Sequence, residues 1–454
     1  MKDITQVTSQ LKQIGDILAS LSKFGRAISP LDSEELQIVP TTFDLSGTAE
    51  PLWPDELSKS LLVGKNKINF QAFIDGVQRS TVVYWVTLDK LGALVPVVLS
   101  HIASGVTIRN EDRKLKIDNR HVRNNLLLLL PLRGMTEAGF QGGELIQGWI
   151  NKGVVIPETK ISEDPIKGLG LNDQIPPLIL CDTTFNNLER DDDAENNIIK
   201  QAYDYEDSRP EFMNRLLMEK NLFNISKIRG RAQGRVNTIR QILEMLVLTK
   251  FREAYGNQNY VLVDGPLFFL GKWLRRYEVL KNKSDFEREE FVLKNAVGMV
   301  KTLKGRPRHM EDLRDILNLK EGTYSRVMSI HDAVDIQTEG DSPSNLEKPH
   351  ITSYLRFRSP PDFKVPNILG LTRIDLHLTT IGANTLDEAI SDKEGTKNSV
   401  QNIMSGVMRE RWPGLSQKGR TYNEVFPISE TERMLRARLY STLEMNYIYS
   451  MIRA

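Results

Sequence analysis

The chain has 454 residues, with 60 Lys and Arg against 59 Asp and Glu, and 40% of its residues are hydrophobic. This length permits two or three domains, and the composition excludes collagen-like, low-complexity and wholly disordered proteins. The net charge of +1 argues against a uniformly basic nucleic-acid coat but permits a local basic groove balanced by acidic loops.

The first half of the chain changes from a helical to a β pattern. Residues 4–24 have apolar positions at the spacing of an amphipathic helix, which predicts an arm or a packing helix. From residue 68 onward, three β-rich runs joined by short breaks predict an antiparallel meander, at 68–76, 80–88 and 93–108. The polar stretch 157–212, which contains the acidic run 189–195, is expected to form solvated loops inserted over the sheet.

The second half alternates helices with strands. Helices are expected at 234–256, 272–281, 286–294, 385–392 and, as a long C-terminal helix, 430–452. Strands are expected at 261–264, 296–303, 353–358 and 371–378. Helix–strand alternation after a meander predicts the α/β class, with a mixed sheet flanked by helices.

The single cysteine and the short apolar runs indicate in which compartment the protein is expected. Cys181 rules out an intrachain disulfide and every cysteine-rich zinc pattern, and it indicates a reducing compartment. The N-terminus lacks the pattern of a signal peptide, and the longest apolar run, 126–130, is far shorter than the roughly 18 residues of a membrane span. We therefore expect a soluble, cytoplasmic protein with no membrane partner.

Several common chemistries have no motif in this sequence. The six histidines never occur as a close pair, which excludes an HExxH-type zinc site. The nearest approach to a phosphate-binding loop, 265–273, has the wrong glycine spacing and carries Trp273 in place of Ser or Thr, so ATP hydrolysis is not expected. A G-x-S-x-G elbow is missing, and Cys181 lies in an apolar run typical of a buried strand rather than of a nucleophile.

Two carboxylates stand at matching places in the sequence. Asp75 and Asp264 each follow an apolar run and precede a glycine, which predicts an uncrowded carboxylate at a strand terminus. Mg²⁺ and Mn²⁺ prefer such oxygens, and two ions roughly 3.5 to 4 Å apart can clamp a phosphodiester. The alternative is that each Asp-Gly is an ordinary turn.

A third carboxylate, Glu244, lies in the helix that precedes Asp264. It borders the apolar face of that helix, as a boundary residue or as a ligand turned toward a site. Arg240, one turn earlier, offers the alternative of an ion pair between positions i and i+4. The periodicity alone leaves both interpretations open.

In combination, these segments resemble the NurA nuclease family. The resemblance rests on FIDG, the helix RQILEML, the strand VLVDGPL, the segment VGMVKT and the late strands SYLRFR and TRIDL, in this order over residues 68–395. It implies an RNase H-like fold with N- and C-terminal helical extensions, divided into an arm at 1–60, a nuclease domain at 61–400 and a helical segment at 401–454. Asp75, Glu244 and Asp264 match the family's catalytic, metal-binding carboxylates, which implies Mn²⁺ or Mg²⁺ as cofactor.

The chain departs from this family at the fourth ligand. The family's late helix supplies a histidine, whereas no histidine follows His377 in this sequence. An acidic residue is the expected replacement, with Asp375 preferred because a strand holds a ligand rigidly. The open alternatives are Asp387, Glu388 and Asp392, or a site of three carboxylates and water.

Basic side chains are expected around the carboxylates because DNA affinity comes chiefly from phosphate neutralisation. The candidates for DNA contact are Arg79, Arg235, Lys301, Arg373 and, by base stacking, Tyr354. Lys301 and Arg373 are preferred because both lie in segments that resemble the family. For each residue, the alternative is a solvated charge or, for Tyr354, packing against a neighbouring strand.

The resemblance implies a homodimeric, Mn²⁺-dependent DNA nuclease that degrades 5′ to 3′, cuts single strands internally and acts with a HerA-like hexameric ATPase. The expected process is DNA end processing in repair or in phage defence. Two rivals remain: a catalytically silent DNA-binding or scaffold subunit of such a complex, and a nuclease or transposase-like enzyme of another RNase H-like branch.

Overall fold

A computed structural model gives the architecture. It describes residues 12, 25–26, 51–53, 61–62, 68–88, 93–137, 142–153, 155–158, 160–161, 165, 169, 178–184, 223–277, 280, 282–301, 307–330, 349–359, 369–411, 424–441 and 444. The expected N-terminal helix and the acidic run 189–195 lie outside the described residues, apart from Lys12, which is helical. The division of the chain into three domains stays a prediction, although the helix α14 (Lys393–Arg409) runs through the expected boundary at residue 400.

The described strands form one mixed sheet of 14 strands. Its centre has the order β13, β14, β10, β9, β3, β4, β6, with β3, β9 and β10 mutually parallel and the other neighbours antiparallel. These strands are β3 (Phe70–Leu88), β4 (Ala93–Arg109), β6 (Arg123–Leu130), β9 (Tyr260–Asp264), β10 (Ala296–Val300), β13 (His350–Arg356) and β14 (Leu371–His377). The α/β class with a flanked mixed sheet is thus confirmed, and the arrangement is consistent with an RNase H-like fold.

Shorter strands extend both ends of the sheet. Beyond β6 lie β8 (Leu178–Asp182) and β7 (Ile156–Pro157), and beyond β13 lie β11 (Thr323–Tyr324) and β2 (Leu61–Leu62). Three more pair beside this path: β1 (Gly25–Arg26), β5 (Leu115–Ile117) and β12 (Met328–Ser329). Cys181 lies buried in β8, as predicted for a strand residue.

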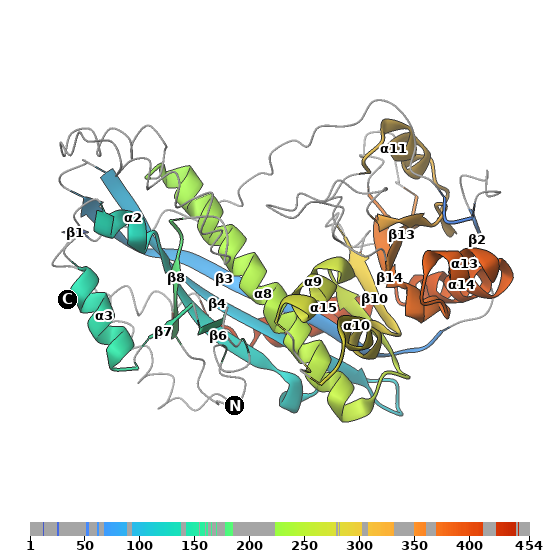
Figure 1. Ribbon diagram of the computed structural model, residues 1–454, viewed down its shortest axis with the longest axis horizontal. Helices are drawn as coiled ribbons and strands as arrows, with labels where there is room; N and C mark the ends of the chain where they lie inside the picture. The colour runs from blue at the N-terminus through green and yellow to red at the C-terminus, as the bar shows by residue number, and fades with distance from the viewer. Residues whose placement is uncertain are drawn as a thin grey trace.

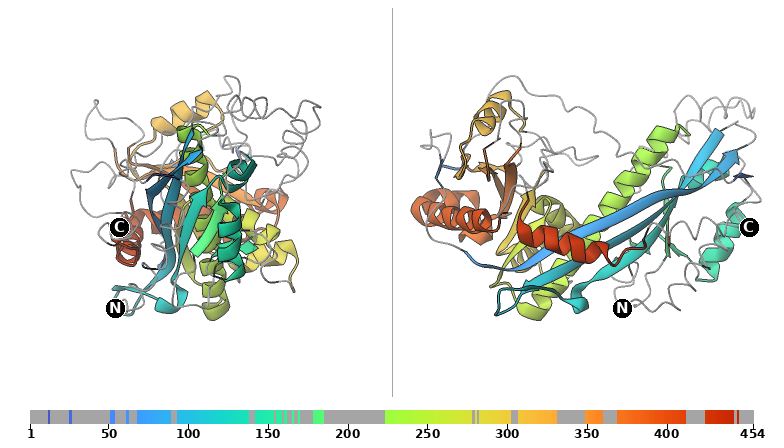
Figure 2. Two further views of the ribbon diagram at one scale, coloured as in Figure 1. Left: turned by 90° about the vertical axis from the view of Figure 1, so that its left-hand side faces the viewer. Right: turned by 180° about the vertical axis from the view of Figure 1, so that it is seen from behind.

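Helices cover both faces of the sheet (Figures 1 and 2). One face carries α8 (Ile225–Tyr255), α9 (Leu267–Arg276) and α10 (Asp285–Leu293), and α15 (Phe426–Arg436) packs along β3 and β4 on the other. The other α-helices in the described part of the chain are α2 (Leu132–Glu137), α3 (Gly143–Asn151), α11 (Met310–Leu317), α13 (Leu386–Ser391) and α14, and the 3₁₀ turns described there are η3 (Asn119–His121) and η5 (Leu378–Ile381). Among the described residues, no helix combines the length and apolarity needed to cross a bilayer.

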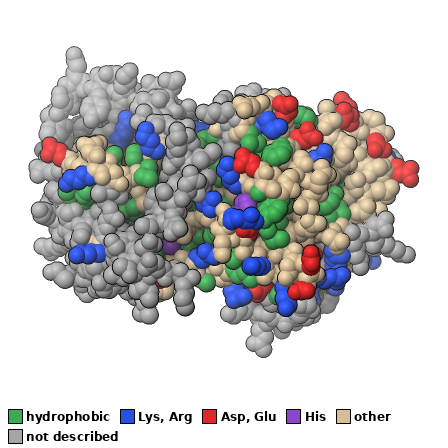
Figure 3. All heavy atoms as spheres, turned by 90° about the horizontal axis from the view of Figure 1, so that it is seen from below, with side chains coloured by type: hydrophobic (Ala, Val, Ile, Leu, Met, Phe, Trp, Pro, Cys, Tyr) green, Lys and Arg blue, Asp and Glu red, His purple; other side chains and the backbone are tan. Residues whose placement is uncertain are grey.

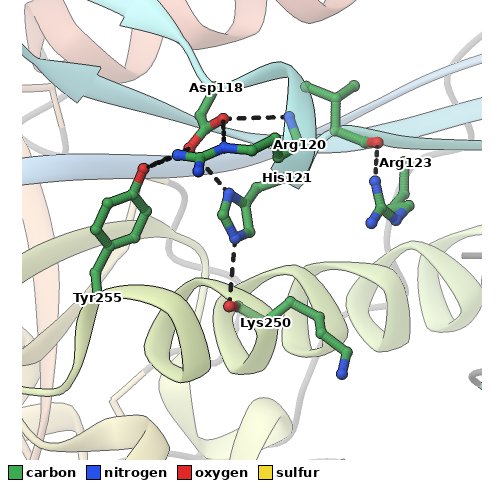
Figure 4. Close-up of polar contacts among 7 residues, drawn as sticks. Asp118, Arg120, His121, Arg123, Lys250 and Tyr255 are labelled. Carbon is green, nitrogen blue, oxygen red and sulfur yellow. Dashed lines mark hydrogen bonds and ion pairs between the residues drawn. The ribbon is translucent and has the colours of Figure 1, made fainter. Parts of the chain in front are cut away.

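A polar network fixes α8 against the end of the β5–β6 connection (Figure 4). The Tyr255 hydroxyl donates to Asp118 Oδ2 over 2.9 Å, and His121 lies between Asp118 (3.0 Å) and the Lys250 carbonyl (3.3 Å). Burial acts to raise the pKa of Asp118, but the hydrogen bonds from Arg120, Tyr255 and His121 hold it below its ordinary value. The helix that carries Glu244 is therefore anchored at its C-terminal end, where Gly256 (φ 74°) terminates it as predicted.

The C-terminal helix differs from the prediction. It begins at Phe426 and ends at Arg436, whereas the sequence predicted 430–452, of which 442–443 and 445–452 lie outside the described residues. The helix ends because the Tyr440 main chain is bound by the sheet: its N–H donates to His101 Nδ1 over 2.9 Å and its carbonyl accepts from Arg79. Pro427, Ile428 and Leu435 of α15 are buried against its own chain, whereas Phe426 at its start is exposed.

Candidate metal centre

Asp75 and Asp264 are brought together by the parallel pairing of β3 and β9. The register pairs Phe73 with Leu262 and Ile74 with Val263, so the next residues along the two strands are Asp75 and Asp264. Strand β9 ends there, and Gly265, at φ 109°, turns the chain away in a conformation that favours glycine. Asp264 thus lies at a strand terminus, as predicted.

Asp75 does not lie at a strand terminus, which corrects the sequence prediction. Strand β3 continues through Asp75 and Gly76 to Leu88, because β4 pairs with it along this whole length. The glycine serves a tertiary contact instead of a turn. A Cβ at Gly76 would clash with the Oε1 atom of Glu244, so only glycine lets the α8 carboxylate approach this strand.

Alternation of side chains along β3 shows on which face of the strand each carboxylate lies. Asp75 shares its face with Phe73 and Val77, and Val77 packs with Leu435 of α15. Gly76 lies on the opposite face, where Glu244 approaches from α8. The carboxylates of Asp75 and Glu244 therefore flank β3 from its two sides, beyond the end of β9.

Two cations accompany the three carboxylates. Lys301 Nζ lies 3.1 Å from Asp264 Oδ1. Arg240 Nη1 lies 3.0 Å from Glu244 Oε1 and donates to the Gly76 carbonyl over 2.8 Å. The predicted ion pair between Arg240 and Glu244 is thus present, and it coexists with the orientation of Glu244 toward the strand.

The carboxylates perturb one another in a buried environment. Burial raises the pKa of Asp75 well above its ordinary value; the charges of Asp264 and Glu244 raise it further, and Lys301 opposes them. Burial likewise raises the pKa of Glu244 to about 7, with Arg240 lowering it and Asp264 raising it. Mutual perturbation of this kind is typical of functional sites.

The carboxylates are nevertheless more widely spaced than a closed metal site. Within the described part of the chain, one group of three His, Cys, Asp or Glu side chains has its ligand atoms all within 4.8 Å of one another, and it is Glu289, His350 and His377. Asp75, Glu244 and Asp264 do not form such a group. Rotation of their side chains is therefore needed before they hold one ion together.

The preferred fourth ligand, Asp375, is separated from this cluster. On β10, Gly298 pairs with Asp375 while the next residue, Met299, pairs with Asp264, so the two aspartates point to opposite faces of the sheet. Asp375 is fully buried, and its oxygens accept hydrogen bonds from Thr352 (2.9 Å) and Arg373 (2.9 and 3.1 Å). It serves as the partner of Arg373, which lies two residues earlier on the same strand.

The other acidic candidates belong to α13 and α14. Glu388 accepts a hydrogen bond from the Asn384 N–H (2.7 Å), and Asp392 caps α14 by accepting from the Gly395 N–H (3.2 Å). Asp387 lies in the first turn of α13, where a negative charge favours the helix dipole. The position of each of these three acidic residues is thus explained by its place at the start of a helix, without a metal.

Most residues that were predicted to contact DNA bind or pack against other residues of the protein instead. Arg235 is 2% exposed and pairs with Glu158 over 3.1 Å, and Arg373 pairs with Asp375. Tyr354 is fully buried in a core cluster, in agreement with the packing alternative, and Arg79 donates to the Tyr440 carbonyl. Lys301 is the predicted basic residue that stands beside the carboxylates.

The face seen from below in Figure 3 carries Lys and Arg interspersed with Asp and Glu. The described surface on this side thus has mixed charge rather than a uniform basic stripe. Affinity for a phosphate backbone on this face would depend on local cations rather than on a broad field.

A second group of possible ligands was not predicted. Antiparallel pairing places His350 of β13 directly opposite His377 of β14, and Glu289 of α10 lies against both. Burial acts to raise the pKa of Glu289, but His350, His377 and Arg275 hold it below its ordinary value. This buried Glu/His/His cluster could hold a metal ion. The sequence carried only part of the signal, because the predicted strand 371–378 contains His377, whereas the predicted strand 353–358 begins after His350.

Neither a protein-family model nor a curated protein sequence matches this chain.

Proposed function

We propose that the chain is a metal-dependent DNA nuclease of the NurA type, with Asp75, Glu244 and Asp264 as its catalytic carboxylates. The observation that carries the proposal is the placement of Asp75 and Asp264 side by side on β3 and β9, with Glu244 of α8 reaching β3 at Gly76; burial and the charges of Asp264 and Glu244 raise the pKa of Asp75. The sequence supplies the matching motifs, and the sheet supplies the register that brings them together.

The balance of charge supports a divalent cation at this cluster. Three carboxylates face two cations, Lys301 and Arg240, and burial raises the pKa of both Asp75 and Glu244. Oxygen ligands of this kind suit Mn²⁺ or Mg²⁺. When bound, such an ion would lower the pKa of a water and stabilise the negative charge of the phosphodiester transition state.

The protein's own groups have separate tasks in this proposal. Asp75 and Asp264, neighbours across β3 and β9, hold the ion, and Glu244 completes the set through the space left open by Gly76. Lys301, 3.1 Å from Asp264, orients that carboxylate and places a positive charge where a phosphate oxygen would lie. Burial raises the pKa of Glu244 and Arg240 opposes this effect, while its guanidinium links the carboxylate to the Gly76 carbonyl of β3.

The partners belong to the same proposal. We propose a cytoplasmic homodimer that acts with a HerA-like hexameric ATPase, degrades DNA 5′ to 3′ and cuts single strands internally, in repair or phage defence. The support is the sequence resemblance together with the lack of a phosphate-binding loop, which leaves ATP-driven translocation to another protein.

The test is cleavage of end-labelled single- and double-stranded DNA by the purified protein with Mn²⁺, Mg²⁺ or EDTA, with and without a HerA-like ATPase. We expect Mn²⁺-dependent cleavage that EDTA abolishes and that Asp75→Asn and Asp264→Asn each reduce by at least about 100-fold. Asp285→Asn, an exposed aspartate on α10 with 60% of its side chain accessible, is the matched control and should cleave normally.

The wide spacing of the carboxylates favours one rival, a silent DNA-binding subunit. That rival predicts DNA binding without cleavage under every metal condition, and binding that Asp264→Asn leaves unchanged. Cleavage at wild-type rates in both aspartate variants would instead point to a different active site.

A further inference from the structure

We propose that Glu289, His350 and His377 form a structural site for a divalent transition metal of the zinc class. The site lies on the opposite face of the sheet from Asp264, because His377 shares a face of β14 with Asp375. It shares no residue with the proposed nuclease centre, whose Asp75 and Asp264 lie on the other face.

The distances in the cluster are too long for hydrogen bonds and close to those of a coordination shell. Glu289 Oε2 lies 3.7 Å from His350 Nε2 and 3.5 Å from His377 Nε2, beyond the usual hydrogen-bond range. Ligands at about 2.0–2.1 Å from a tetrahedral Zn²⁺ are separated by about 3.3 Å. The three ligand atoms all lie within 4.8 Å of one another, so the cluster must contract before it gives three ligands to one ion.

Because these ligand atoms are buried, leaving them without a hydrogen-bond partner is unfavourable. Each of the three side chains is at most 4% exposed. The facing atoms Glu289 Oε2, His350 Nε2 and His377 Nε2 all lack a hydrogen-bond partner, as does His350 Nδ1. Buried polar atoms are nearly always paired, so three that face one another point to a shared ligand. An ion that accepts all three lone pairs would satisfy them at once.

The surroundings orient the ligands as a metal site requires. The other oxygen of Glu289 pairs with Arg275, which fixes the carboxylate. His377 Nδ1 lies 2.7 Å from the Thr379 hydroxyl and 3.3 Å from the Thr379 N–H. In the hydrogen bond from the Thr379 N–H, Nδ1 is the acceptor, so binding of a metal at Nε2 requires the other tautomer, in which Nδ1–H donates to the Thr379 hydroxyl.

Space for the ion comes from α9. A Cβ at Gly271 would lie 2.9 Å from His350 Nε2 and 3.5 Å from Glu289 Oε2, so the helix approaches the cluster where it has no side chain. Two imidazoles and one carboxylate favour Zn²⁺ and its neighbours over Mg²⁺ or Ca²⁺. Since the ligands come from α10, β13 and β14, the ion would tie the helical layer to the late strands.

The experiment uses the full-length protein, stripped with EDTA and titrated with Zn²⁺ or Co²⁺ at neutral pH. We expect one tightly bound equivalent per chain, a visible Co²⁺ spectrum of tetrahedral or five-coordinate type, and a higher melting temperature in the loaded protein. Glu289→Gln and His350→Gln should each weaken binding by at least about 100-fold. Gly271→Ala, a milder variant, should also weaken it.

Two controls separate this site from the nuclease centre. His121→Gln replaces a buried histidine of the network beside α8, and Asp264→Asn removes a carboxylate of the other cluster. Both should retain the tight equivalent. The proposal is overturned if wild-type protein binds no Zn²⁺ or Co²⁺ tightly, or if Gly271→Ala and Glu289→Gln bind it as well as the wild type does. It is equally overturned if Asp264→Asn alone loses the ion.

Discussion

Replacing Glu244 by Gln should change how the stability of the metal-free protein depends on pH. Burial raises the pKa of Glu244 from 4.5 to about 7 in the folded protein. Because the folded pKa lies above the unfolded one, folding takes up a proton between these values, so stability is highest at low pH and falls as the pH rises toward 7. Gln has no such dependence, and its amide oxygen can still accept from Arg240.

The size of the effect follows from the shift. Between pH 5.5 and pH 7 the folded wild type holds about one more proton than the unfolded chain. Its unfolding free energy therefore falls by about 1.36 kcal/mol per pH unit, or about 2 kcal/mol over these roughly 1.5 units. Glu244 is 3% exposed, so solvent screening removes little of this value. The difference in unfolding free energy between Glu244→Gln and wild type should therefore move by about 2 kcal/mol in favour of the variant from pH 5.5 to pH 8.

The assay is urea-induced unfolding in EDTA at these two pH values. Glu253→Gln is the matched control, because Glu253 lies on the same helix with 36% of its side chain exposed. The control should show the pH dependence of the wild type. The raised pKa of Glu244 would be contradicted if the difference in unfolding free energy between Glu244→Gln and wild type stayed constant with pH, or moved in favour of the wild type as the pH rose.

Three further predictions concern the same region. Gly76→Ala should destabilise the fold by about 1–3 kcal/mol in thermal or urea unfolding, because its Cβ would meet Glu244; an unchanged stability would show that the carboxylate moves freely. Arg235→Met should lower the unfolding free energy by about 3–5 kcal/mol, because it strands buried Glu158, while DNA affinity of the folded protein stays unchanged in a fluorescence titration. Mn²⁺ binding should release protons, since the pKa of Asp75 and of Glu244 is raised, and calorimetry in buffers of different ionisation enthalpy would detect this; heats independent of the buffer would contradict it.

Local patterns predicted several elements and their ends well. The alternation in TRIDL gave β14, and the apolar face followed by Gly256 gave the body and the end of α8. Asp264 at the end of β9 was also predicted, because the strand and its Asp-Gly turn are adjacent in sequence. Each of these features depends on neighbours within a few residues.

Features set by tertiary contacts were not predictable in the same way. The Asp-Gly pair at residues 75–76 reads as a turn, but β4 pairs through it and the glycine makes room for a side chain from α8. His350 and His377 are far apart in sequence and meet only through the register of two strands. Similarly, α15 ends at Arg436 because His101 and Arg79 bind the main chain of Tyr440.

Asp375 was the preferred fourth ligand, but it lies on the opposite face of the sheet from Asp264. Alternation along β14 places Asp375 on the same face as Arg373 and His377, but it does not show which face the carboxylates of neighbouring strands occupy. That information lies in the pairing of β9 with β10, which sets Asp264 on the opposite side. A ligand set drawn from several strands therefore requires their register as well as their sequences.

The most direct test of the proposed nuclease centre is the anomalous scattering of Mn²⁺ in crystals of the protein soaked with that ion. The account predicts a peak in direct contact with carboxylate oxygens of Asp75 and Asp264, with Glu244 as a third or water-bridged ligand, and the loss of this peak in Asp264→Asn. A peak confined to Glu289, His350 and His377, or no peak beside the end of β9 at saturating Mn²⁺, would contradict it.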